Sequence, residues 1–225
     1  MKKFMMFAFL VVAQISVAQS PVTKEVGEFN QLNVFDRISV QLIPSKENKI
    51  EIVGARAKEV ELVNKNGKLK VRLPLKKLLK GEEITAKLYF KSIDVIEASE
   101  GSYVSSEKTF SGVSFEINAK EGAEINIQLD VEKATVRATT GGIVKLTGKA
   151  TNQDVVINTG GILQAKTLIT KQTAVSINAG GEADVNATDI VDAKVRAGGN
   201  ITVYGDPKQI NKKHVIGGSI KKAGE

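Results

Sequence analysis

The sequence predicts an all-β protein built as a parallel β-helix, a coil whose turns contain about 20 residues each. Adjacent glycines recur five times, in "TTGGIV", "TGGILQ", "AGGEAD", "AGGNIT" and "IGGSIK", at a nearly constant interval. Apolar and polar residues alternate around these pairs, which is typical of strands with one buried face. Strands that recur at a fixed interval are expected to stack in parallel on their equivalents in the next turn.

Alignment of the repeats predicts which side chains stack inside the coil. Before the glycines we expect two inward columns: Ile96, Ile117, Val136, Ile157, Ile177 and Val195, and then Ala98, Ala119, Ala138, Thr159, Ala179 and Ala197. After the glycines we expect an inward column of Ile125, Val144, Leu163, Ala183 and Ile201. Beside it we expect an outward polar column of Asn126, Lys145, Gln164, Asp184 and Thr202.

Each glycine pair is expected to form a corner, where the chain needs a positive φ or close approach to the neighbouring turn. A phosphate-binding loop is the alternative, but it requires G-x-G-x-x-G or P-loop spacing followed by a helix, and neither spacing occurs. The expected corner residues are Gly141, Gly142, Gly160, Gly161, Gly180, Gly181, Gly198 and Gly199.

The chain opens with "MKKFMMFAFLVVAQISVAQS", which has the pattern of a secretory signal peptide. Lys2 and Lys3 precede a short apolar run, and we expect cleavage after Ala18, giving a signal peptide over residues 1–18. Export places the mature chain in the periplasm, on the outer-membrane surface or outside the cell, with no transmembrane segment. Cysteine is absent, so neither a lipoprotein anchor nor a disulfide is expected.

Residues 19–225 are expected to form a single β-helical domain in two parts, with irregular strands over 22–93 and regular turns over 94–221. Asn66-Gly67 in "VELVNKNGKLKVRLP" predicts a hairpin. Residues 74–83, "PLKKLLKGEE", predict a basic loop or a single helical turn, and residues 84–90 a strand. The irregular strands are expected to cover the open end of the coil or to extend it.

The order of these features resembles the family described as putative auto-transporter adhesin, head GIN domain. The matching stretches are "FNQLNVFDRISVQL", the hairpin, "IDVIEASEGSYV" and the "INTGG" and "INAGG" turns, over roughly residues 26–205. The resemblance implies that the β-helix is right-handed. Because the matching motifs are structural, the resemblance transfers no functional residue.

Catalysis finds little support in the sequence, and no cofactor or metal is expected. The single histidine, His214, aligns with the inward position of Val195 and is interpreted as part of a capping turn. Carboxylate pairs could serve a glycosidase, and the candidates are Asp184 with Asp189 or Asp192, and Glu121 with Glu124. β-helix polysaccharide lyases and hydrolases need long loops to wall a cleft, whereas the loops here are short. A degenerate enzyme of that type is the alternative function.

A second outward column predicts a polar strip, whose members are Glu97, Asn118, Arg137, Asn158, Asn178 and Arg196. The strip is either an asparagine ladder that holds the turns together or a binding surface whose arginines grip anionic groups of a glycan or peptide. The expected function is that of an exported, noncatalytic, adhesin-like binding protein whose partner is a polysaccharide or a cell-surface protein. Removal of Lys2 and Lys3 leaves a net charge of +5 from +7, and the basic residues lack the interleaved aromatics typical of nucleic-acid binding.

Overall fold

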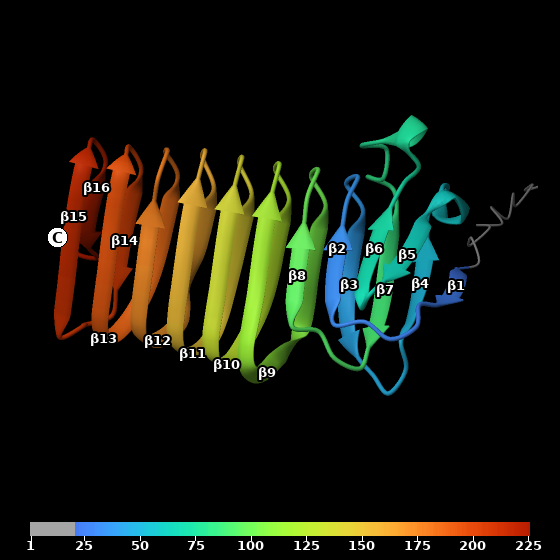
Figure 1. The fold of residues 1–225 in the computed structure, drawn as a ribbon, viewed down its shortest axis with the longest axis horizontal. Coiled ribbons are helices and arrows are strands. Elements are labelled where there is room, and N and C mark those ends of the chain that lie inside the picture. The colour runs from blue at the N-terminus through green and yellow to red at the C-terminus, as the bar shows by residue number, and fades with distance from the viewer. Residues whose placement is uncertain (1–20) are drawn as a thin grey trace, which may run out of the picture.

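The computed structural model describes residues 21–225, so the expected signal peptide lies outside the described residues. Sixteen strands form one continuous sheet, which winds into a right-handed solenoid of about 7 turns of ~19 residues (Figure 1). The predicted β-helix is confirmed. Within the described part of the chain the only helical segments are two 3-10 turns, η1 (Ala57–Glu59) and η2 (Leu75–Lys77).

The regular turns each consist of one long strand followed by a tight corner. The strand bends midway and stays hydrogen-bonded to its neighbours on both sides of the bend, so a regular turn contains a single continuous strand. These strands are β9 (Tyr103–Lys120), β10 (Glu124–Thr139), β11 (Ile143–Asn158), β12 (Ile162–Ile177) and β13 (Glu182–Ala197). The C-terminal end of the coil is formed by β14 (Asn200–Tyr204), β15 (Gln209–Ile216) and β16 (Ser219–Lys222).

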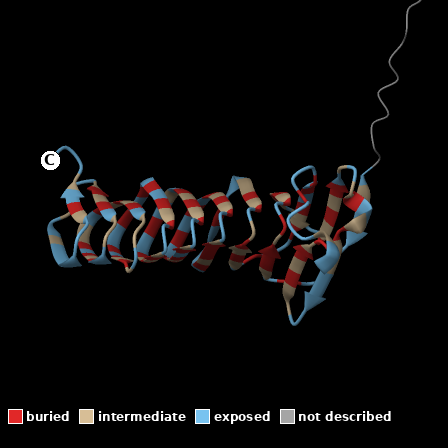
Figure 2. Cartoon of the chain, turned by 90° about the horizontal axis from the view of Figure 1, so that it is seen from above, coloured by how far each residue is buried: buried red, intermediate tan, exposed pale blue. Residues whose placement is uncertain are grey.

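The core is a continuous apolar column inside the coil, visible as buried bands that alternate with exposed ones along each strand (Figure 2). The column expected after the glycines is confirmed, because Ile125 pairs in register with Val144, and the pairing continues through Leu163, Ala183 and Ile201. The adjacent outward column, from Asn126 to Thr202, is confirmed by the same pairings.

The columns expected before the glycines are wrong beyond the third turn, where the register differs by two residues. Val136 pairs with Val155, and Ala138 pairs with Ile157. A shift of two residues keeps every side chain on the same face of a strand, so alternation alone cannot detect it. Thr159, Ala179 and Ala197 are consequently exposed near the corners, whereas Ile157, Ile177 and Val195 continue the column that begins with the three alanines.

The N-terminal strands both extend the coil and cover its end. On one side β6 (Lys68–Arg72), β2 (Gln31–Val34) and β8 (Val95–Ala98) lead in parallel into β9. On the other side β7 (Thr85–Phe90) pairs in parallel with β3 (Ser39–Pro44), which pairs in parallel with β9. Antiparallel strands β1 (Val22–Glu25), β4 (Lys49–Val53) and β5 (Glu61–Lys65) complete this end. The Asn66-Gly67 hairpin between β5 and β6 is confirmed, with positive φ at both residues.

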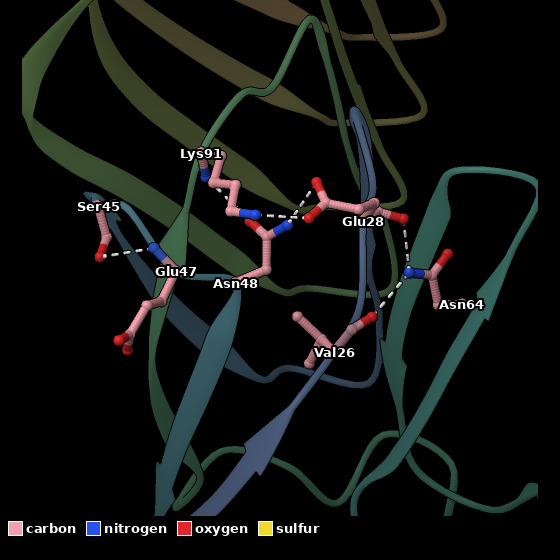
Figure 3. Close-up of polar contacts among 7 residues, drawn as sticks. All are labelled: Val26, Glu28, Ser45, Glu47, Asn48, Asn64 and Lys91. Carbon is pink, nitrogen blue, oxygen red and sulfur yellow. Dashed lines mark hydrogen bonds and ion pairs between the residues drawn. The ribbon is translucent and has the colours of Figure 1, made fainter.

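A polar network joins the loops of this covered end (Figure 3). The buried Asn48 accepts a hydrogen bond from the Lys91 backbone at 2.9 Å and donates to Glu28 at 3.2 Å. Lys91 Nζ lies 2.6 Å from the Glu28 carboxylate, and this bond is the main cause that lowers the pKa of Glu28. Asn64 donates to the Val26 and Glu28 carbonyl oxygens at 2.7 and 2.9 Å. The network therefore ties the β1–β2 connection to three other segments.

Candidate binding surface

A groove of about 470 Å³ lies where the N-terminal strands meet the first regular turn. Its walls combine an aromatic ring, an acid, a base and several hydrogen-bonding groups with apolar side chains. A concave, partly apolar surface with a few convergent polar groups is the usual form of a ligand site. The lining residues are Pro21, Ser39, Val40, Gln41, Glu51, Val53, Thr85, Ala86, Lys87, Tyr103 and Ser105.

The strand register brings these side chains together from distant parts of the sequence. Gln41 pairs with Lys87 on one side and with Ser105 on the other, and Lys87 pairs with Glu51. Paired residues in neighbouring strands project on the same face. Tyr103 joins the same face because it pairs with Ser39.

The same row of outward residues continues from the groove along the whole coil. Ser105 pairs with Asn126, and the confirmed outward column carries the row onward until Thr202 pairs with Lys221. At about 4.8 Å per strand the ten residues span about 43 Å. We call this set the polar row: Glu51, Lys87, Gln41, Ser105, Asn126, Lys145, Gln164, Asp184, Thr202 and Lys221.

Contacts within this face fix several of its charged groups. The Glu51 carboxylate accepts a hydrogen bond from the Tyr89 hydroxyl at 3.2 Å and lies 3.4 Å from Lys49 Nζ. Farther along, Lys145 lies 2.8 Å from Glu124. Burial is the main cause that raises the pKa of Asp184, with a smaller contribution from Glu182 and an opposing hydrogen bond from Thr202.

The polar strip expected from the sequence falls into two columns on the outer face of the other half of each turn. Glu97, Asn118 and Arg137 pair in register, but Arg137 pairs next with Val156 instead of Asn158. The cause is the two-residue register difference described above. Asn158, Asn178 and Arg196 therefore form a separate column, one outward position farther along the strands.

Most members of the expected strip are already engaged by neighbours. The Asn178 side chain donates to the Asn158 side chain at 2.8 Å, and Glu97 lies 3.2 Å from Lys120 Nζ. Asn118 is only 6% exposed and donates to Glu116 at 2.9 Å. Arg137 and Arg196 are exposed. These contacts favour the asparagine-ladder interpretation, while a binding role for the strip stays a prediction.

The carboxylates considered for catalysis have separate partners. Asp189 lies 2.8 Å from Lys208, and Asp192 accepts a hydrogen bond from Asn211 at 2.7 Å. Glu124 is paired with Lys145, and Glu121 occupies a corner with a φ of 52°. Asp189, Asp192 and Glu124 are therefore each bonded to a group other than Asp184.

The last regular turn holds the single histidine. His214 pairs with Val195 as the alignment predicted, and it is exposed at the C-terminal end of the coil. Within residues 21–225, histidine, cysteine and acidic side chains form no group of three that could hold a metal ion. No helix in the same range is long and apolar enough to serve as a membrane span.

The groove residues were not predicted as a site. The outward positions of Ser39, Gln41 and Lys87 follow from alternation with the buried Val40 and Ala86. Their proximity depends on β7 inserting between β3 and β4, an order of strands that no local sequence signal specifies.

Comparison with known proteins identifies the family and the fold. A family model described as "Putative auto-transporter adhesin, head GIN domain" matches residues 28–207. A search of curated proteins finds no match.

Solved structures share the same architecture. A putative adhesin from Bacteroides fragilis NCTC 9343 is 22% identical, with a TM-score of 0.83, covering 91% of this chain and 97% of that one. A putative adhesin from Parabacteroides distasonis ATCC 8503 is 18% identical, with a TM-score of 0.70 and coverage of 91% and 96%. A protein from the same strain described as a putative lipid binding protein is 17% identical, with a TM-score of 0.68 and coverage of 91% and 97%.

Proposed function

Because the chain belongs to the family described as putative auto-transporter adhesin, head GIN domain, we propose that it is an exported adhesin-like protein that binds an extended cell-surface polymer without catalysis. The polymer lies along the polar row, with one end in the groove. A polysaccharide is the partner that this surface fits best. Cell-surface protein is the second class of partner.

The observation that carries this proposal is the continuity of the groove with the polar row. Ten strands present hydrogen-bonding or charged side chains at a constant spacing of about 4.8 Å. A linear polymer can repeat the same contact at successive units on such a surface. The groove adds Tyr103, whose ring can pack on a sugar face, beside the Glu51 carboxylate and the Lys87 ammonium group.

We propose that the protein is not a catalyst because the polar row lies on a flat face of the sheet. Beyond the groove, the row follows a regular sheet face with short corners on either side. Catalysis benefits from a site that surrounds the substrate and excludes water, and a flat row leaves the substrate in contact with solvent.

A degenerate polysaccharide lyase or hydrolase is the second candidate function. The observation that favours it is Asp184, whose pKa is raised above its ordinary value mainly by burial, as general acids often require. Glu182 is the nearest candidate for a second carboxylate. Release of reducing ends from a bound polysaccharide, abolished by Asp184→Asn, would replace the binding proposal with this one.

The test is a glycan-array screen followed by titration of the glycans that bind. Tyr103→Ala and Lys87→Gln are each expected to weaken binding by about tenfold or more, because both side chains line the groove. Lys194→Gln is the matched control for Lys87→Gln, since Lys194 lies in an outward column of the opposite half of the turns and pairs with Lys213. Equal effects of Lys87→Gln and Lys194→Gln, or no glycan binding by the parent protein, would contradict the proposal.

A further inference from the structure

The loop between β6 and β7 exposes three leucines among lysines. Its sequence over residues 74–80 is "PLKKLLK". Leu75 is 80% exposed, and Leu78 and Leu79 are each 44% exposed. The loop, which contains η2, projects beyond the ends of the neighbouring strands (Figure 1). Apolar side chains of this size at a projecting tip indicate a surface that contacts another molecule.

The loop is held in place at its base by hydrogen bonds to two side chains from other segments. Asp36, which is 1% exposed, accepts hydrogen bonds from the backbone of Leu73 at 2.8 Å and of Leu79 at 2.9 Å. The Arg56 guanidinium donates to the Lys80 carbonyl oxygen at 2.9 Å. The leucines are therefore presented on an anchored segment.

The backbone at Leu79 is strained in a way that glycine would relieve. Its φ is 59°, a conformation that bulky L-residues rarely adopt. Strained backbone of this kind concentrates at functional sites. Among the non-glycine residues with positive φ in the described part of the chain, Leu79 is the only one with an apolar side chain, and that side chain is 44% exposed.

The charges of the loop indicate an anionic partner. Lys76 and Lys80 form no ion pair within residues 21–225, while Lys77 lies 2.7 Å from Glu59. Leu75 and Leu78 also line a hollow of about 210 Å³, whose charged lining residues are Lys70, Arg72, Asp36 and Glu100. Arg72 is paired with Glu61 at 3.1 Å. Leucines flanked by lysines are the combination that inserts at the boundary between lipid headgroups and acyl chains.

We propose that this loop binds the surface of an anionic lipid bilayer. Leu75, Leu78 and Leu79 enter the boundary between headgroups and acyl chains, and Lys76 and Lys80 contact the anionic headgroups. This membrane contact goes beyond the polymer binding proposed above and uses different residues. An experiment can therefore disprove membrane binding without disproving polymer binding, and the reverse.

The experiment is sedimentation of the protein with vesicles of phosphatidylcholine containing about one third phosphatidylglycerol, compared with vesicles of phosphatidylcholine alone. The variant Leu75→Ser/Leu78→Ser/Leu79→Ser is expected to lose about tenfold or more of the partitioning into anionic vesicles. Val215→Ser/Ile216→Ser is the matched control, because these residues are 59% and 71% exposed but lie on β15. All proteins carry the same N-terminal segment, so any contribution of residues 1–20 is common to them.

Leu79→Gly separates membrane contact from a structural role. It is expected to weaken partitioning while leaving the thermal midpoint unchanged or higher, since glycine relieves the positive φ. Failure of the parent protein to bind anionic vesicles would overturn the proposal. The loop would then be assigned to contact with another protein. Unchanged partitioning of the triple leucine variant would overturn it as well.

Discussion

Replacing Gly142 with alanine is expected to destabilise the solenoid far more than the same change at its neighbour Gly141. The two glycines of this corner are required for different reasons. Gly141 has a φ of 72°, and a Cβ added there meets no atom within 4 Å. A Cβ on Gly142 would lie 2.2 Å from the backbone oxygen of Ala119 and 2.5 Å from its carbonyl carbon.

The difference can be estimated from these contacts. An alanine at Gly141 would only have to adopt the left-handed backbone conformation, which costs about 1 kcal/mol. The preceding residue, Thr140, already has a φ of 50°. At Gly142 the clash is with backbone, which has to move by about 1 Å, at a typical cost of 1–3 kcal/mol. That movement also weakens the hydrogen bond from the Ile143 backbone to Ala123, worth about 1 kcal/mol. We therefore expect a loss of about 3 kcal/mol or more for Gly142→Ala.

Urea unfolding followed by circular dichroism measures the two free energies of unfolding. The expected gap of about 2 kcal/mol corresponds to a difference of roughly 4–8 °C in thermal midpoint for a chain of this size. Gly160 and Gly161 repeat the same geometry in the next turn and provide a second pair for the comparison. Equal losses at the two positions of a pair, or a larger loss at the first, would refute the assignment of these separate roles.

Three further predictions concern buried or bonded polar groups. Glu100→Gln should raise the free energy of unfolding at pH 7. Burial and then Asp36 raise the pKa of Glu100 above its ordinary value of 4.5, so its ionised form opposes folding above the raised pKa. The gain should shrink as the pH falls through that raised pKa and vanish below pH 4.5, and a gain independent of pH would contradict this cause. Asp36→Ala should cost about 3 kcal/mol in urea unfolding by leaving two loop backbone donors unpaired, and a loss under 1 kcal/mol would count against that anchor. Asn158→Ala/Asn178→Ala should lower stability by about 1 kcal/mol while leaving glycan binding unchanged, whereas lost binding at unchanged stability would restore the expected strip as a site.

The regular half of the fold could be predicted from the sequence because the constraints there are local and repeated. Alternation identified the buried face, and the glycine pairs located the corners. The column from Ile125 to Ile201 was correct because it follows directly after the glycines. The columns before them failed, since Val136 and Ala138 both point inward and alternation is equally satisfied by either register.

The candidate site could not be predicted because it depends on the order of strands in space. Lys87 reaches Gln41 and Glu51 only because β7 lies between β3 and β4. Similarly, the exposure of Leu75 depends on the anchoring of its loop by Asp36, which lies nearly forty residues earlier in the chain. The sequence showed a basic loop there but gave no indication of which side chains it would expose.

The most direct test of the proposed binding face is lysine footprinting by mass spectrometry, with and without a glycan that binds. The polar row contains Lys87, Lys145 and Lys221, whereas Lys194 and Lys213 pair with each other in an outward column of the opposite half of the turns. We predict that the glycan protects the three row lysines from acetylation and leaves the other two reactive. Protection of Lys194 and Lys213 instead, or equal reactivity at all five positions, would contradict the proposal that this face holds the polymer.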